Sequence, residues 1–285
     1  MWKMSMRTNE ILSAHSKQHT WSGEGTLSLK TFSHGQDYYA VGDQRYLVDE
    51  SNYLLLNQGQ TYTITVDSPT PLASFCLFFA PGFAEEVYYS STVQSAVLLD
   101  NPEPTPLAPL NFFEKTYPHD ASLANQLVQL SARFSARQAE CSWVQEQFHA
   151  IVQRLLAIHR AIYQEIETLP ALRAATREEL YRRLHAARDY MAAAYSQPVT
   201  LEVVARIACL SPTHFLRTFK QLFHQTPHQY LTEQRLNQAK KYLRNTEQSV
   251  TEICYAVGFE SLGSFSWLFR RHVGCSPEQY RRAKR

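Results

Sequence analysis

The chain has 285 residues and is nearly neutral, with 28 Lys and Arg against 26 Asp and Glu. At about 100–200 residues per domain, this length suggests two domains. The charge is unevenly divided: residues 171–285 hold 18 Lys and Arg against 9 Asp and Glu, a net of +9, whereas residues 1–170 hold 10 against 17, a net of −7. A basic C-terminal part joined to an acidic N-terminal part suggests a polyanion-binding module attached to a domain of another kind.

Several protein classes are disfavoured by the composition. The five cysteines are scattered and no CxxC occurs, which argues against a disulfide framework or a zinc site and fits a reducing cytoplasm. The N-terminus, MWKMSMRTNEILSAHSKQ, lacks the apolar segment that a signal peptide carries. No stretch of about 18 apolar residues occurs, so we expect no membrane span and a cytoplasmic location.

Residues from about 25 to 113 have the pattern of β-strands. Runs rich in β-branched and aromatic residues, GTLSLKTF, RYLVDESNYLLLN, TYTITV and LASFCLFFA, are separated by Pro, Gly, Asn and Asp. Many short strands with turn signals predict a small barrel or sandwich. The segment NPEPTPLAP, residues 101–109, is excluded from a helix or a central strand, because each proline lacks a backbone donor.

The period of the apolar residues changes after this proline-rich segment. Apolar side chains at helical spacing predict two amphipathic helices, at about 122–137 and 141–167. Their apolar stripes are compatible with a dimer interface or with packing on their own barrel. Pro170 interrupts the pattern, so residues 168–176 are predicted to be an interdomain linker.

A repeat with a period of 50 residues runs through the C-terminal part. Seven positions match in register, and all are identical except one Lys/Arg pair. The matched pairs are Ser211/Ser261, Phe215/Phe265, Phe219/Phe269, Lys220/Arg270, Pro227/Pro277, Gln229/Gln279 and Tyr230/Tyr280. Upstream, the same register pairs Val203 with Ile253 and Val199 with Ser249.

Each copy of the repeat has the pattern of a helix-turn-helix. Thr200 and Ser249 are suited to cap a short helix, LEVVARIA in one copy and VTEICYAV in the other. A turn follows, CLS or GFES, and Ser211 and Ser261 then cap a longer helix. A short helix, a tight turn and a longer helix form the helix-turn-helix motif.

The two predicted units, at about 200–223 and 250–273, are joined by a predicted helix at about 227–244. At 1.5 Å per residue this helix spans about 27 Å, and successive major grooves on one side of B-DNA lie about 34 Å apart. One connecting helix can therefore hold two recognition helices in adjacent major grooves. A preceding helix, at about 177–195, is predicted to be capped by Thr176.

The C-terminal repeat resembles the AraC/XylS family of transcription regulators over about residues 177–282. The clearest match is the run RLNQAKKYLRNTEQSVTEICYAVGFESLGSFSWLFRRHVGCSPEQYRR, with its GF turn, its F...F pair and its G.SP..YR ending. The resemblance implies an α+β chain, in which a β-rich, cupin-like sensing and dimerising domain (1–167) precedes an all-α DNA-binding domain (177–285). The implied partners are double-stranded DNA, a small-molecule effector, RNA polymerase and a second copy of the chain bound through the N-terminal domain.

The sequence departs from the family pattern at three positions. Cys209 stands where the first turn often has Gly, and Cys254 stands where Ala is common. Both are small and apolar, so we expect the turn and the packing to survive. His224 replaces the glycine that the repeat matches to Gly274, and a histidine is tolerated poorly if this position needs a positive φ.

In each second helix, one face is predicted to be core and the other to read DNA. Helical spacing assigns to the core Phe215, Phe219, Leu222, Phe265, Leu268 and Phe269. The opposite face of the first copy carries Thr213, His214, Leu216, Arg217 and Lys220. Arg217 is the best candidate base reader, because a guanidinium can bind O6 and N7 of guanine, while Thr213 and Leu216 suit thymine methyl groups.

The second copy is predicted to contact DNA bases with a different set of side chains. Its exposed face offers Leu262, Gly263, Ser264, Ser266 and Trp267. Because Trp267 stands at the position of Arg217, we hypothesise that the first unit supplies most base discrimination and the second supplies affinity and shape readout. Candidate phosphate-binding residues are Lys240, Lys241, Arg270, Arg271, Arg281, Arg282, Lys284 and Arg285.

The N-terminal half offers an aromatic pocket rather than a catalytic centre. His15, His19, His34 and His119 do not form the cluster of ligands that a catalytic metal needs, and no nucleotide-binding or nucleophile motif occurs. We therefore expect no metal, no cofactor and no enzymatic activity. The candidate effector-binding residues, for which ordinary sheet core is the alternative, are Trp21, Tyr38, Tyr39, Tyr46 and Phe75.

The competing function is a DNA-binding enzyme, of repair or cupin type, that carries the same C-terminal repeat. A repair methyltransferase of this kind needs a zinc-held cysteine with clustered partners, and the scattered cysteines argue against it. The missing histidine set argues against a cupin enzyme.

Overall fold

The structure is a computed structural model that describes residues 8–92, 109–169 and 173–284. It divides into two compact units, Met1–Thr168 and Leu169–Arg285. The predicted irregular segment 101–109 lies outside the described residues, apart from Pro109. No helix among the described residues is long and apolar enough to cross a membrane.

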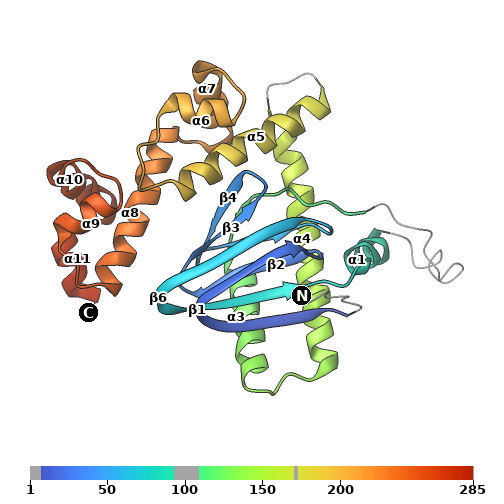
Figure 1. Ribbon diagram of the computed structural model, residues 1–285. Coiled ribbons are helices and arrows are strands. Elements are labelled where there is room, and N and C mark those ends of the chain that lie inside the picture. The colour runs from blue at the N-terminus through green and yellow to red at the C-terminus, as the bar shows by residue number, and fades with distance from the viewer. Residues whose placement is uncertain (1–7, 93–108, 170–172, 285) are drawn as a thin grey trace, which may run out of the picture. The chain divides into compact units, whose positions relative to one another are not determined.

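The N-terminal unit is built on an antiparallel sheet of seven strands within the described residues (Figure 1). The strands are β1 (Glu10–Glu24), β2 (Ser28–His34), β3 (Asp37–Val41), β4 (Gln44–Val48), β5 (Asn52–Leu56), β6 (Thr61–Phe78) and β7 (Thr116–Pro118). Their order is β4-β3-β6-β2-β5-β7, and β1 also pairs with β6. Because β4 at one end approaches β5 and β7 at the other, the sheet curls into a barrel, which confirms the predicted β-rich barrel domain.

Three elements of this unit, β6, β1 and one helix, differ from the sequence prediction. The runs TYTITV and LASFCLFFA, expected as separate strands, belong to the single strand β6 of 18 residues. Strand β1 was not predicted, because its 15 residues are mostly polar and its face is largely exposed; it is held by pairing with β6, with one irregularity between Ser16 and Gln18. Helix α1 (Phe83–Thr92) lies in the region expected to be strands and buries only Ala84 and Val87.

Helices α3 (Ala121–Ser135) and α4 (Cys141–Glu167) follow the sheet, close to the predicted ranges. The buried side chains of α3 are Leu123, Leu127 and Leu130. Fully burying a side chain of this size contributes about 1.5–3 kcal/mol, so this stripe accounts for the position of α3.

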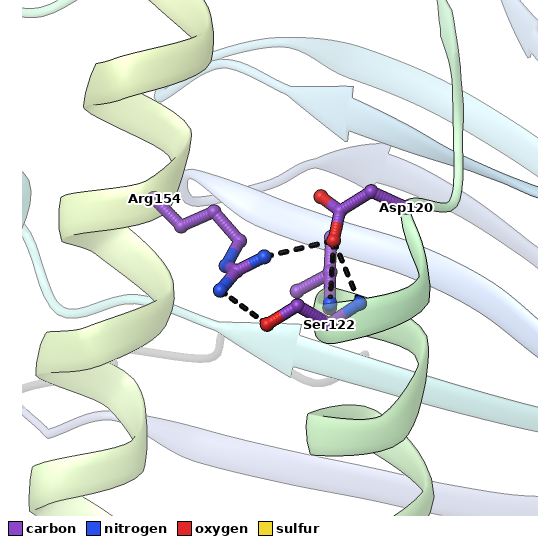
Figure 2. A network of polar contacts seen from close by, with 4 residues as sticks. Asp120, Ser122 and Arg154 are labelled. Carbon is purple, nitrogen blue, oxygen red and sulfur yellow. Dashed lines mark hydrogen bonds and ion pairs between the residues drawn. The ribbon is translucent and has the colours of Figure 1, made fainter.

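The start of α3 is fixed by a polar network around Asp120 (Figure 2). One oxygen of the Asp120 carboxylate accepts hydrogen bonds from the backbone N–H of Ser122 at 2.9 Å and of Leu123 at 2.8 Å. Arg154 of α4 donates to the same carboxylate at 2.8 Å and also to the Ser122 hydroxyl. These backbone hydrogen bonds, with the Arg154 charge, lower the pKa of Asp120, and the network ties α3 to α4.

The regular elements of the C-terminal unit are all helices within its described residues (Figure 1). Its helices are α5 (Ala174–Ala193), α6 (Leu201–Ile207), α7 (Pro212–Phe223), α8 (Pro227–Asn245), α9 (Val250–Ala256), α10 (Leu262–Val273) and α11 (Pro277–Lys284). Helix α8 contacts α5 and α7 on one side of the repeat and α9 and α11 on the other. The predicted pair of helix-turn-helix units joined by one helix is thereby confirmed.

The predicted start of α5 is wrong. The helix begins at Ala174 with Arg173 as its N-cap, so Thr176 lies inside the first turn and does not cap it. The backbone N–H groups of Thr176 and Arg177 both donate to the Arg173 carbonyl at 3.1 Å. Two alanines, the best helix formers, precede Thr176 and extend the helix through the expected end of the linker.

Candidate nucleic-acid interface

Both helix-turn-helix units begin with the predicted side-chain caps. Thr200 accepts a hydrogen bond from the Val203 N–H at 3.4 Å, and Ser249 accepts one from the Glu252 N–H at 3.2 Å. The Glu252 carboxylate in turn accepts the Ser249 N–H, which completes a capping box and lowers the pKa of Glu252. Satisfied helix ends fix where each short helix starts.

The register predicted upstream of the turns is wrong by one residue. The caps Thr200 and Ser249, and the buried residues Val204 and Ile253, occupy equivalent positions 49 residues apart, not 50. Val203 therefore does not match Ile253, and Val199 does not match Ser249. The second turn is one residue longer than the first, which restores the period of 50 at Ser211 and Ser261, the caps of α7 and α10.

Both turns and both helix ends need left-handed backbone conformations. Cys209 has φ 50° in the first turn, where Gly258 has φ 90° in the second. His224 has φ 56° at the end of α7, where Gly274 has φ 88° at the end of α10. The first copy thus holds two side chains in a conformation that favours glycine.

The predicted core faces of α7 and α10 are buried in most positions. Phe215, Phe219, Phe265 and Phe269 are fully buried, and Leu222 is nearly so. Leu268 is only partly buried, so the second copy packs this position less deeply. These residues hold the two longer helices against the rest of the unit and leave their opposite faces outward.

The outward face of α7 carries the predicted DNA-contacting residues of the first helix-turn-helix unit. Thr213, Leu216, Arg217 and Lys220 are exposed, and His214 is half-buried. Leu216 also borders an apolar hollow whose lining includes Met191, Val204 and Leu231. Arg217 is the exposed residue of this face best able to make a bidentate contact with a base.

The outward face of α10 has a different chemistry. Its exposed residues include Leu262, Gly263, Ser264, Trp267, Arg270 and Arg271, and Ser266 is half-buried. The Trp267 side chain is 59% exposed, although it is the largest apolar side chain of the helix. The Arg271 guanidinium lies 5.1 Å from the centre of the indole ring, which places a charge next to this apolar surface.

Arg235 links the two helix-turn-helix units, and our sequence analysis did not single it out. It lies on α8, and its guanidinium donates to the Tyr195 carbonyl at 2.8 Å and to the Gln197 carbonyl at 3.0 Å, just beyond α5. A Cβ atom at Gly258 in the second turn would lie 2.8 Å from the same Tyr195 oxygen and 3.1 Å from the Arg235 Nε. The only sequence signal for this role is the position of Arg235 at the start of the RLNQAKKYL run.

The other candidate phosphate-binding residues differ in their exposure and in their hydrogen bonds. Arg282 is exposed, and Lys240 and Lys241 are half-buried on α8. Arg281 donates to the Gln248 carbonyl, which ties α11 to the segment before α9. Lys284 lies at the end of α11, and Arg285 lies outside the described residues.

The candidate effector residues separate into two groups in the barrel. Tyr39 and Tyr46 belong to its buried interior cluster, and Trp21 packs against that cluster. Tyr38 neighbours Tyr39 on β3 and so lies on the opposite face, where Arg45 stacks on its ring at 4.7 Å. Phe75, next to Cys76 on β6, likewise lies on the face opposite the interior, although it is buried.

A buried lysine, also missed by the sequence analysis, occupies the barrel interior. Lys30 is 1% exposed and donates to the Tyr62 hydroxyl at 2.9 Å, with its ammonium 3.7 Å from the centre of the Phe78 ring. Burial lowers the pKa of Lys30 to about 8. The run GTLSLKTF gives one signal, since Lys30 shares a strand face with Phe32, which is core.

Among the described residues, no group of three or more His, Cys, Asp and Glu side chains is arranged to hold a metal ion. His119, directly after β7, pairs its Nε2 with the Thr31 hydroxyl at 3.2 Å. Burial lowers the pKa of His119. This histidine therefore serves the packing of the sheet.

Comparison with known proteins identifies both units. An AraC-like ligand binding domain matches residues 13–143, and a helix-turn-helix domain matches residues 204–283. The HTH-type transcriptional activator RhaS of Enterobacter sp. (strain 638) is 39% identical over 90 residues, which are 32% of this chain and 32% of that protein. The uncharacterized HTH-type transcriptional regulator YdiP of Escherichia coli (strain K12) is 39% identical over 88 residues, 31% of this chain and 29% of that protein.

The chain thus spans about a third of the length of these curated relatives. Among solved structures, the C-terminal domain of AraT, a response regulator from Geobacillus stearothermophilus, is 36% identical. That match covers 35% of this chain and 84% of the other, with a TM-score of 0.34.

Proposed function

Since the chain belongs to the AraC/XylS family of transcription regulators, we propose that it binds specific sequences in double-stranded DNA and thereby regulates transcription. The observation that carries this proposal is the pair of outward-facing helices, α7 and α10, joined by α8. The 19 residues of α8 span about 28 Å, which suits recognition helices in successive major grooves about 34 Å apart. The net charge of +9 on residues 171–285 supplies attraction to phosphates.

In this proposal the two helix-turn-helix units contribute differently to base recognition. In the first, Arg217 binds a guanine, and Thr213, His214, Leu216 and Lys220 border the same groove. A bidentate arginine–guanine contact discriminates by about 1–3 kcal/mol against the wrong base. In the second, Trp267 stands in place of arginine, so that unit contributes mainly affinity, with Arg270 and Arg271 directed at phosphates.

The N-terminal unit is the sensing and dimerising part in this proposal, with residues 1–167 set apart from a DNA-binding domain of residues 177–285. A small-molecule effector would meet the barrel interior at Trp21, Tyr39 and Tyr46. A second copy of the chain would bind through this unit, and RNA polymerase would be the further partner. The protein would act in the cytoplasm.

The test is selection of bound sequences from random DNA with the full chain, followed by titration of the selected DNA by fluorescence anisotropy. We expect one enriched motif with two half-sites, and Arg217→Ala to weaken binding and to abolish the preference for guanine at one position. Arg160→Ala, an exposed arginine on α4, is the control and should bind like the natural chain. Enrichment of no motif would refute the proposal.

A further inference from the structure

The outward face of α10 exposes apolar side chains, and it has Trp267 at the position where the first copy has Arg217. Leu262 is 38% exposed and Trp267 is 59% exposed. Gly263 and Ser266 lie one helical turn from Trp267 and Leu262 respectively, so these four residues form one face, here called the Trp267 face. A Cβ atom at Gly263 would meet only the Ser261 hydroxyl, at 3.7 Å, so the backbone is open to close approach on this face.

The Trp267 face is not explained by the packing of the unit. Phe265 and Phe269, on the opposite side of α10, are fully buried and supply its core contact. Exposed apolar surface on a helix that is otherwise held in place marks an interaction site. The basic residues Arg270 and Arg271 adjoin the face, which fits a polyanion such as DNA and opposes a basic or a wholly apolar protein partner.

The Arg271 guanidinium places a positive charge beside the apolar Trp267 face. It lies 5.1 Å from the indole centre of Trp267, one turn further along α10. Both copies have a basic residue at the matched positions Lys220 and Arg270. The first copy has a second one, Arg217, at the position of Trp267, whereas the second copy has Arg271 at the position of Gln221. The second copy therefore has this charge one helical turn further along, at Arg271. An indole ring, that of Trp267, occupies the position that Arg217 has in the first copy.

In the major groove, the apolar group on a base edge is the C5 methyl of thymine. We infer that the second half-site is read through thymine methyl groups that pack against Trp267 and Leu262, while Arg271 holds the indole and neutralises a nearby phosphate. This inference rests on the proposed function and names the base chemistry that its second unit recognises. Ser266 and the bare backbone at Gly263 let the helix approach closely enough for this contact.

The test replaces each thymine of the selected second half-site by deoxyuridine, which removes only the methyl group. Burial of one such group changes affinity about fourfold, so we expect the natural chain to bind the substituted site about fourfold more weakly at each contacted thymine. Trp267→Ala should bind thymine and uracil equally at the position that packs on the indole, and should keep the preference for thymine at a position that packs on Leu262. Because Trp267 is exposed, this variant should keep the folded helical spectrum, which circular dichroism checks.

Two controls separate the outcomes. The same substitution in the first half-site should weaken the natural chain and Trp267→Ala by equal factors. If uracil in the second half-site leaves the affinity of the natural chain unchanged, or weakens Trp267→Ala as much as the natural chain at every position, the inference is overturned while the proposed function stands. If selection enriches no motif at all, the proposed function and this inference fail together. The thymine–uracil comparison on the natural chain decides the matter even if the variant does not fold.

Discussion

Arg235→Ala should loosen the connection between the two helix-turn-helix units. The change removes the hydrogen bonds to the Tyr195 carbonyl at 2.8 Å and to the Gln197 carbonyl at 3.0 Å. A hydrogen bond to a charged group contributes about 1.5–3 kcal/mol, and solvent reaches this half-buried arginine, so we expect a loss of about 2 kcal/mol in total. For a unit of this size that lowers Tm by about 8 °C.

Loss of the Arg235 hydrogen bonds should also change how strongly DNA affinity depends on the spacing between the two half-sites. Inserting one base pair between the half-sites shifts them by about 3.4 Å and rotates them by about 34°, from about 10.5 base pairs per turn. The natural chain, with α5, α8 and the second turn held together at Arg235, should lose at least tenfold in affinity for such DNA. Arg235→Ala should lose much less, at the cost of weaker binding to the original spacing.

The assay is anisotropy on the selected DNA with one base pair added or removed, beside thermal melts of the same protein. Arg281→Ala is the matched control, because it removes a bond to the Gln248 carbonyl within the second half of the repeat. It should lower Tm and keep the spacing preference. Equal spacing preference in the natural chain and Arg235→Ala would refute the role of Arg235 in setting the distance between the readers.

Two further predictions concern stability. His224→Gly should raise the free energy of unfolding by about 0.5–1 kcal/mol, because a side chain at φ 56° costs about 1–2 kcal/mol and glycine returns part of this as chain entropy; a drop in urea melts would contradict it. Lys30→Met should stabilise the chain below pH 8, because burial lowers the pKa of Lys30 from 10.5 to about 8. The unfolded chain binds the proton that the folded chain releases between about pH 8 and 10.5, so the natural chain gains stability as pH rises through this window, by up to about 3 kcal/mol. The difference between the natural chain and Lys30→Met in urea melts should shrink over that window, and a constant difference would show that Lys30 does not titrate there.

The C-terminal unit could be predicted from sequence because its signals are local. Caps such as Ser211 and Ser261 bond to backbone groups three residues away, and the phenylalanine pairs recur at helical spacing. The error in the upstream register arose because an extra residue in a turn leaves no mark in the spacing of the longer helices. Arg235 could not be assigned a role, since its partners at Tyr195 and Gln197 lie 40 and 38 residues away.

The N-terminal barrel was predictable as a class and not in detail. Strand β1 is ordered by pairing with β6, an interaction set by the partner strand rather than by the residues of β1. Tyr38 and Phe75 were placed with Tyr39 by residue type alone, whereas strand alternation sends them to the other face. Lys30 was overlooked because a lysine between apolar residues is usually a solvated side chain, and only the closed sheet buries it.

Binding of two unequal helix-turn-helix units in successive major grooves is tested most directly by dimethyl sulfate protection of guanine N7, combined with hydroxyl-radical footprinting on the selected DNA. We expect two protected patches on one face of the DNA, about 10 base pairs apart. Guanine N7 protection should be confined to the patch that disappears in Arg217→Ala. A single patch, or two patches that respond equally to Arg217→Ala, would contradict this mode of binding.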